Sequence, residues 1–231
     1  MADGAMSLAR RIAYCTAFAI AMAYVESAVV LYLRLLVNDS HTLFPLKPVP
    51  PDIYRAEFVR EGATIVMLSA VALLQSRRPR VAGAYFLYCF GIWDIFYYVW
   101  LEVLIGWPHS ILSWDILFFI PLPWFSPVLS PVIVSLLFIA GALVILWREN
   151  RSEPIAFRPV DFALFFVGAL LILASYLVEL PQVERTGSPG EYPWWLFLLG
   201  IAGWIGAFAR GAAKGRKRSR AKDKTADSLP R

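Results

Sequence analysis

Residues 81–104, VAGAYFLYCFGIWDIFYYVWLEVL, form a long run of mostly apolar side chains with Asp94 near its middle. A helix of this length rises about 36 Å at 1.5 Å per residue, enough to cross the roughly 30 Å hydrocarbon core of a bilayer. The composition agrees with this interpretation. Of the 231 residues, 59% are hydrophobic and 17% are charged, whereas soluble domains carry about 25% charged residues. The sequence therefore predicts an integral membrane protein.

Further apolar windows lie on both sides of this run, and together they predict six transmembrane helices. The predicted crossings are residues 12–34, 57–75, 81–104, 129–147, 161–180 and 192–209. The expected fold is thus an all-α, polytopic membrane protein, with residues 1–209 forming the transmembrane domain. Small residues in the last crossing, Gly200, Gly203 and Gly206, are expected to let another helix approach closely.

The distribution of Lys and Arg predicts the orientation. With a cytoplasmic N-terminus, 17 of the 22 basic residues fall on the cytoplasmic side and five on the outer side. Because basic residues accumulate in cytoplasmic loops, both termini are expected in the cytoplasm and the protein in the inner or plasma membrane. The net charge of +5 is explained by topology, so nucleic acid is not an expected partner.

Two segments do not fit a simple crossing. In residues 113–127, SWDILFFIPLPWFSP, the prolines cannot sit in an undisturbed helix, which predicts an interfacial or re-entrant segment that caps a cavity on the outer side. A kinked fourth helix is the alternative, and residues 111–128 are not assigned more firmly. Residues 210–231 are strongly basic and are expected to form a disordered tail near anionic lipid headgroups.

Ionisable residues within the predicted helices concentrate in the outer half of the first three crossings, where each is costly unless it has a partner, water or a function. They are Glu26, Glu57, Arg60, Glu61 and Asp94. The i, i+3, i+4 spacing of residues 57, 60 and 61 places them on one helix face. One interpretation is a structural network in which Arg60 bridges Glu26 and Asp94. The other interpretation is a proton-exchanging or cation-accepting site. It is favoured because several carboxylates face chiefly Arg60, while Arg34 is expected to extend outward.

Aromatic residues surround this cluster. Tyr97 and Tyr98 follow Asp94 at i+3 and i+4, on the same helix face, and Asp115 adds a carboxylate from the Pro-rich segment. Aromatic faces attract cations, although Trp and Tyr also collect at membrane interfaces as anchors. The expected ligand- or proton-binding residues are Glu26, Glu57, Arg60, Glu61, Asp94, Tyr97, Tyr98 and Asp115. The Pro-rich loop at residues 38–57 is expected to fold over them as a lid.

No motif names a reaction. Glu-x-x-His pairs, phosphate-binding loops and nucleophile elbows are missing, and the two histidines, His41 and His109, lie in predicted outer loops, so neither a metal nor another cofactor is expected. We therefore consider three functions: binding, with proton-coupled movement, of a small cationic or amphipathic ligand; acid–base catalysis on a lipophilic substrate; and a non-catalytic subunit of an oligomer or larger membrane complex. No catalytic residue is assigned.

Overall fold

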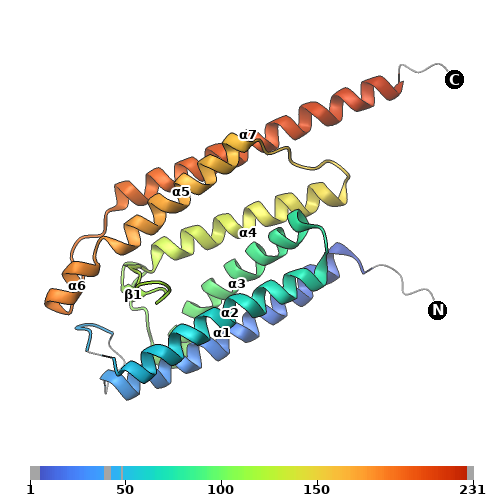
Figure 1. Ribbon diagram of the computed structural model, residues 1–231. Helices are drawn as coiled ribbons and strands as arrows, with labels where there is room; N and C mark the ends of the chain where they lie inside the picture. The colour runs from blue at the N-terminus through green and yellow to red at the C-terminus, as the bar shows by residue number, and fades with distance from the viewer. Residues whose placement is uncertain (1–5, 39–42, 48, 228–231) are drawn as a thin grey trace.

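The computed structural model describes residues 6–227 except 39–42 and 48, with side chains to residue 214 apart from that of residue 38. In this part of the chain the elements are α1 (Leu8–Asn38), α2 (Pro51–Gln75), α3 (Pro79–Ile105), β1 (Trp114–Ile116), β2 (Phe125–Pro127), α4 (Leu129–Asn150), α5 (Pro159–Leu177), α6 (Leu180–Thr186) and α7 (Trp194–Asp227). The long helices run along a common axis (Figure 1). We call the end that carries β1 and β2 the hairpin end, and the opposite end the tail end.

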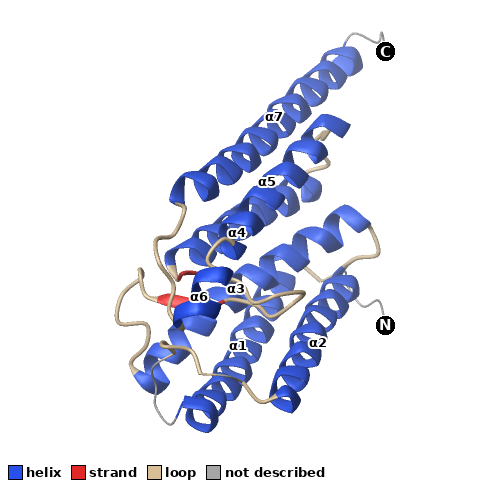
Figure 2. Cartoon of the chain, turned by 60° about the vertical axis from the view of Figure 1, so that its left-hand side comes forward, coloured by secondary structure: helices blue, strands red, loops and turns tan. Residues whose placement is uncertain are grey.

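Five segments are long and apolar enough to cross a membrane, which confirms the prediction of a polytopic, all-α membrane protein. They are Leu8–Val37, Pro79–Ile105, Leu129–Asn150, Pro159–Thr186 and Trp194–Lys214. The helix α2 lies beside α1 and α3 in both views but is not one of the five (Figures 1 and 2). Its first half carries the charged residues of the predicted cluster, so the count of six crossings is not confirmed.

The first four helices form one packed group. The helix α3 lies between α1 and α4, and α2 packs mainly on α3. Gly91 of α3 permits the closest approach, because a Cβ atom there would lie 2.6 Å from the backbone oxygen of Ser135 on α4. Cys15 and Cys89 are buried in the core of this group as free thiols. The packing therefore fixes the relative positions of the helices that carry the predicted site.

The second group is the pair α5 and α7, which run side by side next to α4 (Figure 2). A Cβ atom on Gly168 or Gly200 would lie 2.8 or 2.7 Å from the backbone oxygen of the other glycine. Gly203 has ordinary contacts and Gly206 has nothing within 4 Å of such an atom. The expected close approach of another helix to α7 thus exists. Of the three glycines named from the sequence, only Gly200 lies at this contact.

The Pro-rich segment forms a β-hairpin, which the sequence did not predict. Strands β1 and β2 pair antiparallel, with Asp115 opposite Ser126, and α4 begins only after them. The alternative of a kinked fourth helix is therefore wrong. Pro121 and Pro123 fall in the connection between the strands, where no ladder hydrogen bond is needed from them. The hairpin lies at one end of the helices (Figure 2). Its residues line a cavity together with those of the predicted cluster.

At the tail end, α7 continues through the basic segment to Asp227, where the sequence predicted a disordered tail after Ala209. This part of α7 extends beyond the other helices (Figure 1). Arg210 is tied to the bundle, because its guanidinium pairs with Asp161 at the start of α5. The last four residues lie outside the described part of the chain, and the division of the chain at residue 209 stays a prediction.

Candidate functional site

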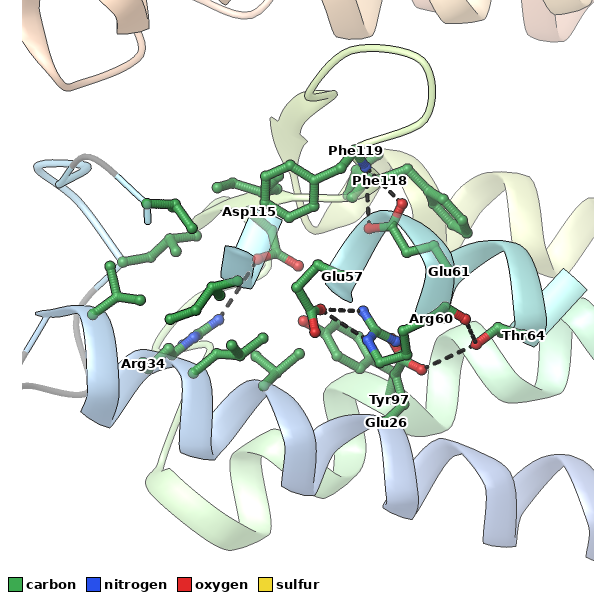
Figure 3. A pocket seen from close by; sticks show the side chains of 18 of the residues that line it. Glu26, Arg34, Glu57, Arg60, Glu61, Thr64, Tyr97, Asp115, Phe118 and Phe119 are labelled. Carbon is green, nitrogen blue, oxygen red and sulfur yellow. Dashed lines mark hydrogen bonds and ion pairs between the residues drawn. The ribbon is translucent and has the colours of Figure 1, made fainter. Parts of the chain in front are cut away.

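All eight predicted site residues line one cavity at the hairpin end, with a volume of about 110 Å³. Figure 3 labels six of them: Glu26, Glu57, Arg60, Glu61, Tyr97 and Asp115. The cavity walls come from α1, α2, α3 and the hairpin, and from three residues that precede α2. Three residues of the predicted lid, Leu43, Leu46 and Val49, line the cavity, and closure of this loop over the site stays a prediction. His41, the other residue named in this loop, lies outside the described residues.

Arg60 joins α1 to α2. Its Nε and Nη2 atoms lie 2.8 and 2.7 Å from Oε2 of Glu57, and its Nη1 atom pairs with Glu26. Thr64, one turn further along α2, also donates to Glu26, at 3.5 Å. The predicted bridge from Arg60 to Asp94 is wrong, because Glu57 on the same face of α2 is the second partner. The three charged groups converge in Figure 3.

The side chain of Glu61 points toward the hairpin and not toward Arg60 (Figure 3). The backbone N–H of Phe119 donates to both of its carboxylate oxygens, at 2.8 and 3.1 Å. The ring of Phe119 also meets Tyr54 of α2 edge-on, with centroids 5.5 Å apart. Glu61 is buried, so its carboxylate satisfies a peptide group that would otherwise lack a partner. This carboxylate holds the hairpin against α2.

Arg34 is a site residue that sequence reasoning missed. It was expected to extend outward, but its side chain is only 3% exposed and lies 3.6 Å from Asp115 of β1. Its guanidinium also lies over the ring of Trp107, 4.0 Å from the centroid. The position of Arg34 near the end of a helix suggested an interfacial role, and the hairpin that covers it was not predicted. No local sequence signal pairs it with Asp115.

Burial raises the pKa of the Asp115 carboxyl group to about 6. The positive charge of Arg34 and the backbone N–H of Ile116 act in the opposite direction, but burial is the larger effect. Asp115 therefore gains or loses a proton within a physiologically relevant pH range. It is the titratable group that the hairpin contributes to the cavity.

Asp94 is held by a neutral partner. The hydroxyl group of Ser135 on α4 donates to Asp94 Oδ2 at 2.8 Å. Tyr97 and Tyr98 line the same cavity and meet each other edge-on, with ring centroids 4.9 Å apart. Trp93, a second residue that sequence reasoning missed, also lines the cavity, and its indole nitrogen is buried with no hydrogen-bond partner in the described part of the chain. The cavity thus has an aromatic wall beside the half-buried carboxylate of Asp94.

Charge is unequally distributed among the described residues that line this cavity. Five carboxylates face two guanidinium groups. Arg60 pairs with two of the carboxylates and Arg34 with one. Glu61 and Asp94 accept hydrogen bonds from neutral groups and have no ion pair within the described residues. The site is therefore suited to a proton or a cation.

A metal site has less structural support in this cavity than a site for a proton or an organic cation. Among the described residues, no three or more His, Cys, Asp or Glu side chains are arranged to hold a metal ion. Each carboxylate in the cavity is already directed at an arginine, a peptide N–H or a hydroxyl group. The expectation that no metal or cofactor is bound stays a prediction.

Comparison with known proteins gives one partial similarity. No protein-family model matches the chain, and no solved structure matches it. Undecaprenyl-diphosphatase 2 from Rhodospirillum rubrum is 47% identical over 60 residues, which are 26% of this chain and 22% of the relative. The chain thus spans about a fifth of the length of the curated relative that it matches. This similarity covers too little of either protein to show a family.

Proposed function

We propose that the protein binds an amphipathic molecule whose cationic head occupies the cavity at the hairpin end. The observation that carries the proposal is the excess of carboxylates over guanidinium groups in the lining of this buried cavity. A buried carboxylate is costly unless a proton or a positive charge accompanies it. Glu61 and Asp94 have only neutral partners among the described residues, so a cation has two carboxylates to neutralise.

The walls of the cavity support the amphipathic character of the ligand. Apolar side chains from three segments surround the charged groups, among them Val30, Leu46 and Ile53. The tyrosines on α3 add ring faces, which attract a cation when water is excluded. An inorganic ion would leave these apolar walls without a partner. A molecule with a charged head and an apolar body would fill both parts.

Proton coupling is the more specific part of the proposal. Because the pKa of Asp115 is about 6, this carboxyl group carries a proton in acid and a negative charge at neutral pH. A cation that arrives at neutral pH meets one more negative charge than it does at pH 5. Ligand affinity is then expected to fall as the pH decreases through 6. Movement of the ligand across the membrane would be a further step, tested by uptake into vesicles.

An enzyme acting on a lipid is the second candidate, and the partial similarity favours it. The relative is named as an undecaprenyl-diphosphatase, an enzyme that acts on undecaprenyl diphosphate. In this chain Asp94 would be the general acid or base, because it lines the cavity and has no ion pair in the described residues. A diphosphate is an anion and would meet an excess of carboxylates, so the charge of the cavity supports this candidate less. A purely structural subunit is supported least, since it predicts no cavity at the acids.

A headgroup series separates the two candidates. Three single-chain molecules with the same tail and an amine, a hydroxyl or a phosphate head are titrated into the purified protein, and thermal stability is measured. The proposal predicts stabilisation by the amine alone. Stabilisation by the phosphate, together with phosphate release from undecaprenyl diphosphate that is lost in Asp94→Asn, would contradict it and support the enzyme.

A further inference from the structure

We infer that a groove between α4 and the pair α5 and α7 holds the hydrocarbon tail of the ligand whose head occupies the hairpin-end cavity. The inference rests on the proposed function and extends it to a substrate class, long-chain lipids with a cationic head. It is based on two further cavities, a middle one of about 290 Å³ and a tail-end one of about 710 Å³.

The three cavities adjoin one another. The hairpin-end cavity and the middle cavity share Asp94, Leu117 and Phe118 in their walls. The middle cavity and the tail-end cavity share Phe138, Ala169 and Trp204. Asp94 thus stands where the charged cavity meets the apolar ones. A ligand with its head near Asp94 has a route for its tail along the helices.

The groove is chemically suited to a hydrocarbon chain. The lining of the tail-end cavity contains no charged residue among the described ones and is rich in phenylalanine. Phe138 and Trp204 stack with centroids 5.4 Å apart at the junction of the two apolar cavities. Both cavities lie within the range of about 300 to 1,000 Å³, or close to it, that is usual for ligand sites. A hydrocarbon chain bound in the groove would contact these apolar side chains in place of bilayer lipid or empty space.

The length of the groove points to a long tail. Along α4 it extends from Pro131 in the middle cavity to Ile145 in the tail-end cavity. Fourteen residues at 1.5 Å per residue give about 21 Å, roughly two-thirds of the hydrocarbon core of a bilayer. A short-chain amine would leave most of this length unoccupied.

The groove is open at its side, so a lipid can enter from the bilayer. Phe166 of α5 lines the tail-end cavity and is 65% exposed.

Near the head end, two indole nitrogens are buried without a hydrogen-bond partner in the described residues. They belong to Trp124, which lines the middle cavity, and to Trp93. Two unused N–H donors favour a head that also carries an oxygen acceptor. A long-chain amino alcohol has both groups.

Photocrosslinking tests the inference. The probe is a long-chain amino alcohol with a diazirine in the distal part of its tail, and labelled peptides of the full-length protein are identified by mass spectrometry. Ala169→Phe places a ring in the wall shared by the two apolar cavities. Ala163→Phe is the matched control, because Ala163 is another exposed alanine of α5 that lines none of the three cavities.

The inference predicts labels on the facing residues of α4, α5 and α7, and about a tenfold lower yield in Ala169→Phe but not in Ala163→Phe. Equal yields in the two variants, or labels confined to outward-facing residues, would overturn it. Absence of groove labels in a protein that is dimeric in solution would also overturn it and would assign the groove to a second copy. The head site is tested separately by Glu61→Gln with Asp94→Asn: retained probe binding in that variant refutes the proposed function, whereas the Ala169→Phe result tests the groove.

Discussion

Arg60 holds the buried carboxylate of Glu57 and the half-buried one of Glu26, and this makes it the most sensitive single residue of the site. Its substitution by glutamine leaves Glu26 and Glu57 facing each other without a positive charge. Breaking a buried ion pair costs about 3–5 kcal/mol, so we expect a large decrease in the thermal unfolding temperature of Arg60→Gln. Arg55→Gln is the control on the same helix: its pair with Asp52 is exposed, and we expect a change of less than about 0.5 kcal/mol. Similar unfolding temperatures for the two variants would contradict the network.

Asp115 is expected to make stability depend on pH. The pKa of its carboxyl group is about 6 in the folded protein, against an ordinary value of 3.8. Between these values the folded protein binds a proton that the unfolded chain has released, so this group's contribution to stability falls as the pH rises from about 4 to 6. The shift corresponds to at most about 3 kcal/mol.

The measurement is the thermal unfolding of wild type and Asp115→Asn between pH 4 and 7.5. Residue 115 cannot titrate in the variant, so the stability of Asp115→Asn lacks this decrease with rising pH. At neutral pH the variant is less stable than wild type, because the negative charge beside Arg34 is lost. Parallel pH profiles for the two proteins would show that Asp115 has an ordinary pKa.

Sequence reasoning selected residues that line one cavity but did not find how they pair, and their role in binding a ligand or proton stays a prediction. The residues that the structure gathers around the cavity include all eight that were selected from their charge and their depth in the helices. Depth along a helix, however, does not say which side chains face each other across two helices. The pair of Arg60 with Glu26 was considered from the sequence. The pair of Arg60 with Glu57, the contact of Asp94 with Ser135 and the burial of Arg34 emerged only from the structure.

At the scale of helices, the contact between α5 and α7 depends on Gly200. A methyl group there would lie 2.7 Å from the backbone oxygen of Gly168, so the helices would have to separate. We expect Gly200→Ala to destabilise the protein by about 1–3 kcal/mol. Gly206→Ala has open space and gains helix propensity, so it is expected to be neutral or stabilising by up to about 1 kcal/mol. Thermal unfolding of both variants checks this, and a stabilised Gly200→Ala would contradict the packing.

The helices were predictable and the hairpin was not. Long apolar runs specify transmembrane helices because backbone groups in lipid must be satisfied within the segment. The prolines of residues 113–127 excluded a regular helix, but the strands they separate are three residues each, too short to give a periodic pattern. Their position depends on Glu61, which is far away in the sequence. Phe118 and Phe119 of this segment line the cavity, as a cap would, whereas the position of this cavity on the outer side stays a prediction.

For the whole molecule, the charge distribution predicts which side of the membrane each end faces. Arg77, in the connection between α2 and α3, is expected in the cytoplasm, whereas Arg185 in α6 is expected outside, and both are exposed. Single substitutions to cysteine, labelled in intact cells with a membrane-impermeant thiol reagent, are expected to react at residue 185 and not at residue 77. The buried native cysteines, Cys15 and Cys89, give little background. The reverse pattern of labelling would invert the predicted topology.

The cavity at the hairpin end is formed by residues from several helices and the hairpin. Its proposed function as a cation site depends on Glu61 and Asp94, which have no charged partner among the described residues. The most direct measurement is the affinity of the purified protein for a long-chain amino alcohol at pH 7.5, in wild type, in Glu61→Gln with Asp94→Asn, and in Glu102→Gln. Glu102 is exposed on α3 and does not line the cavity, so it controls for the loss of an acid. We predict at least about a tenfold loss of affinity in the double variant and none in Glu102→Gln. A double variant that folds normally and binds as wild type does would contradict the proposed function.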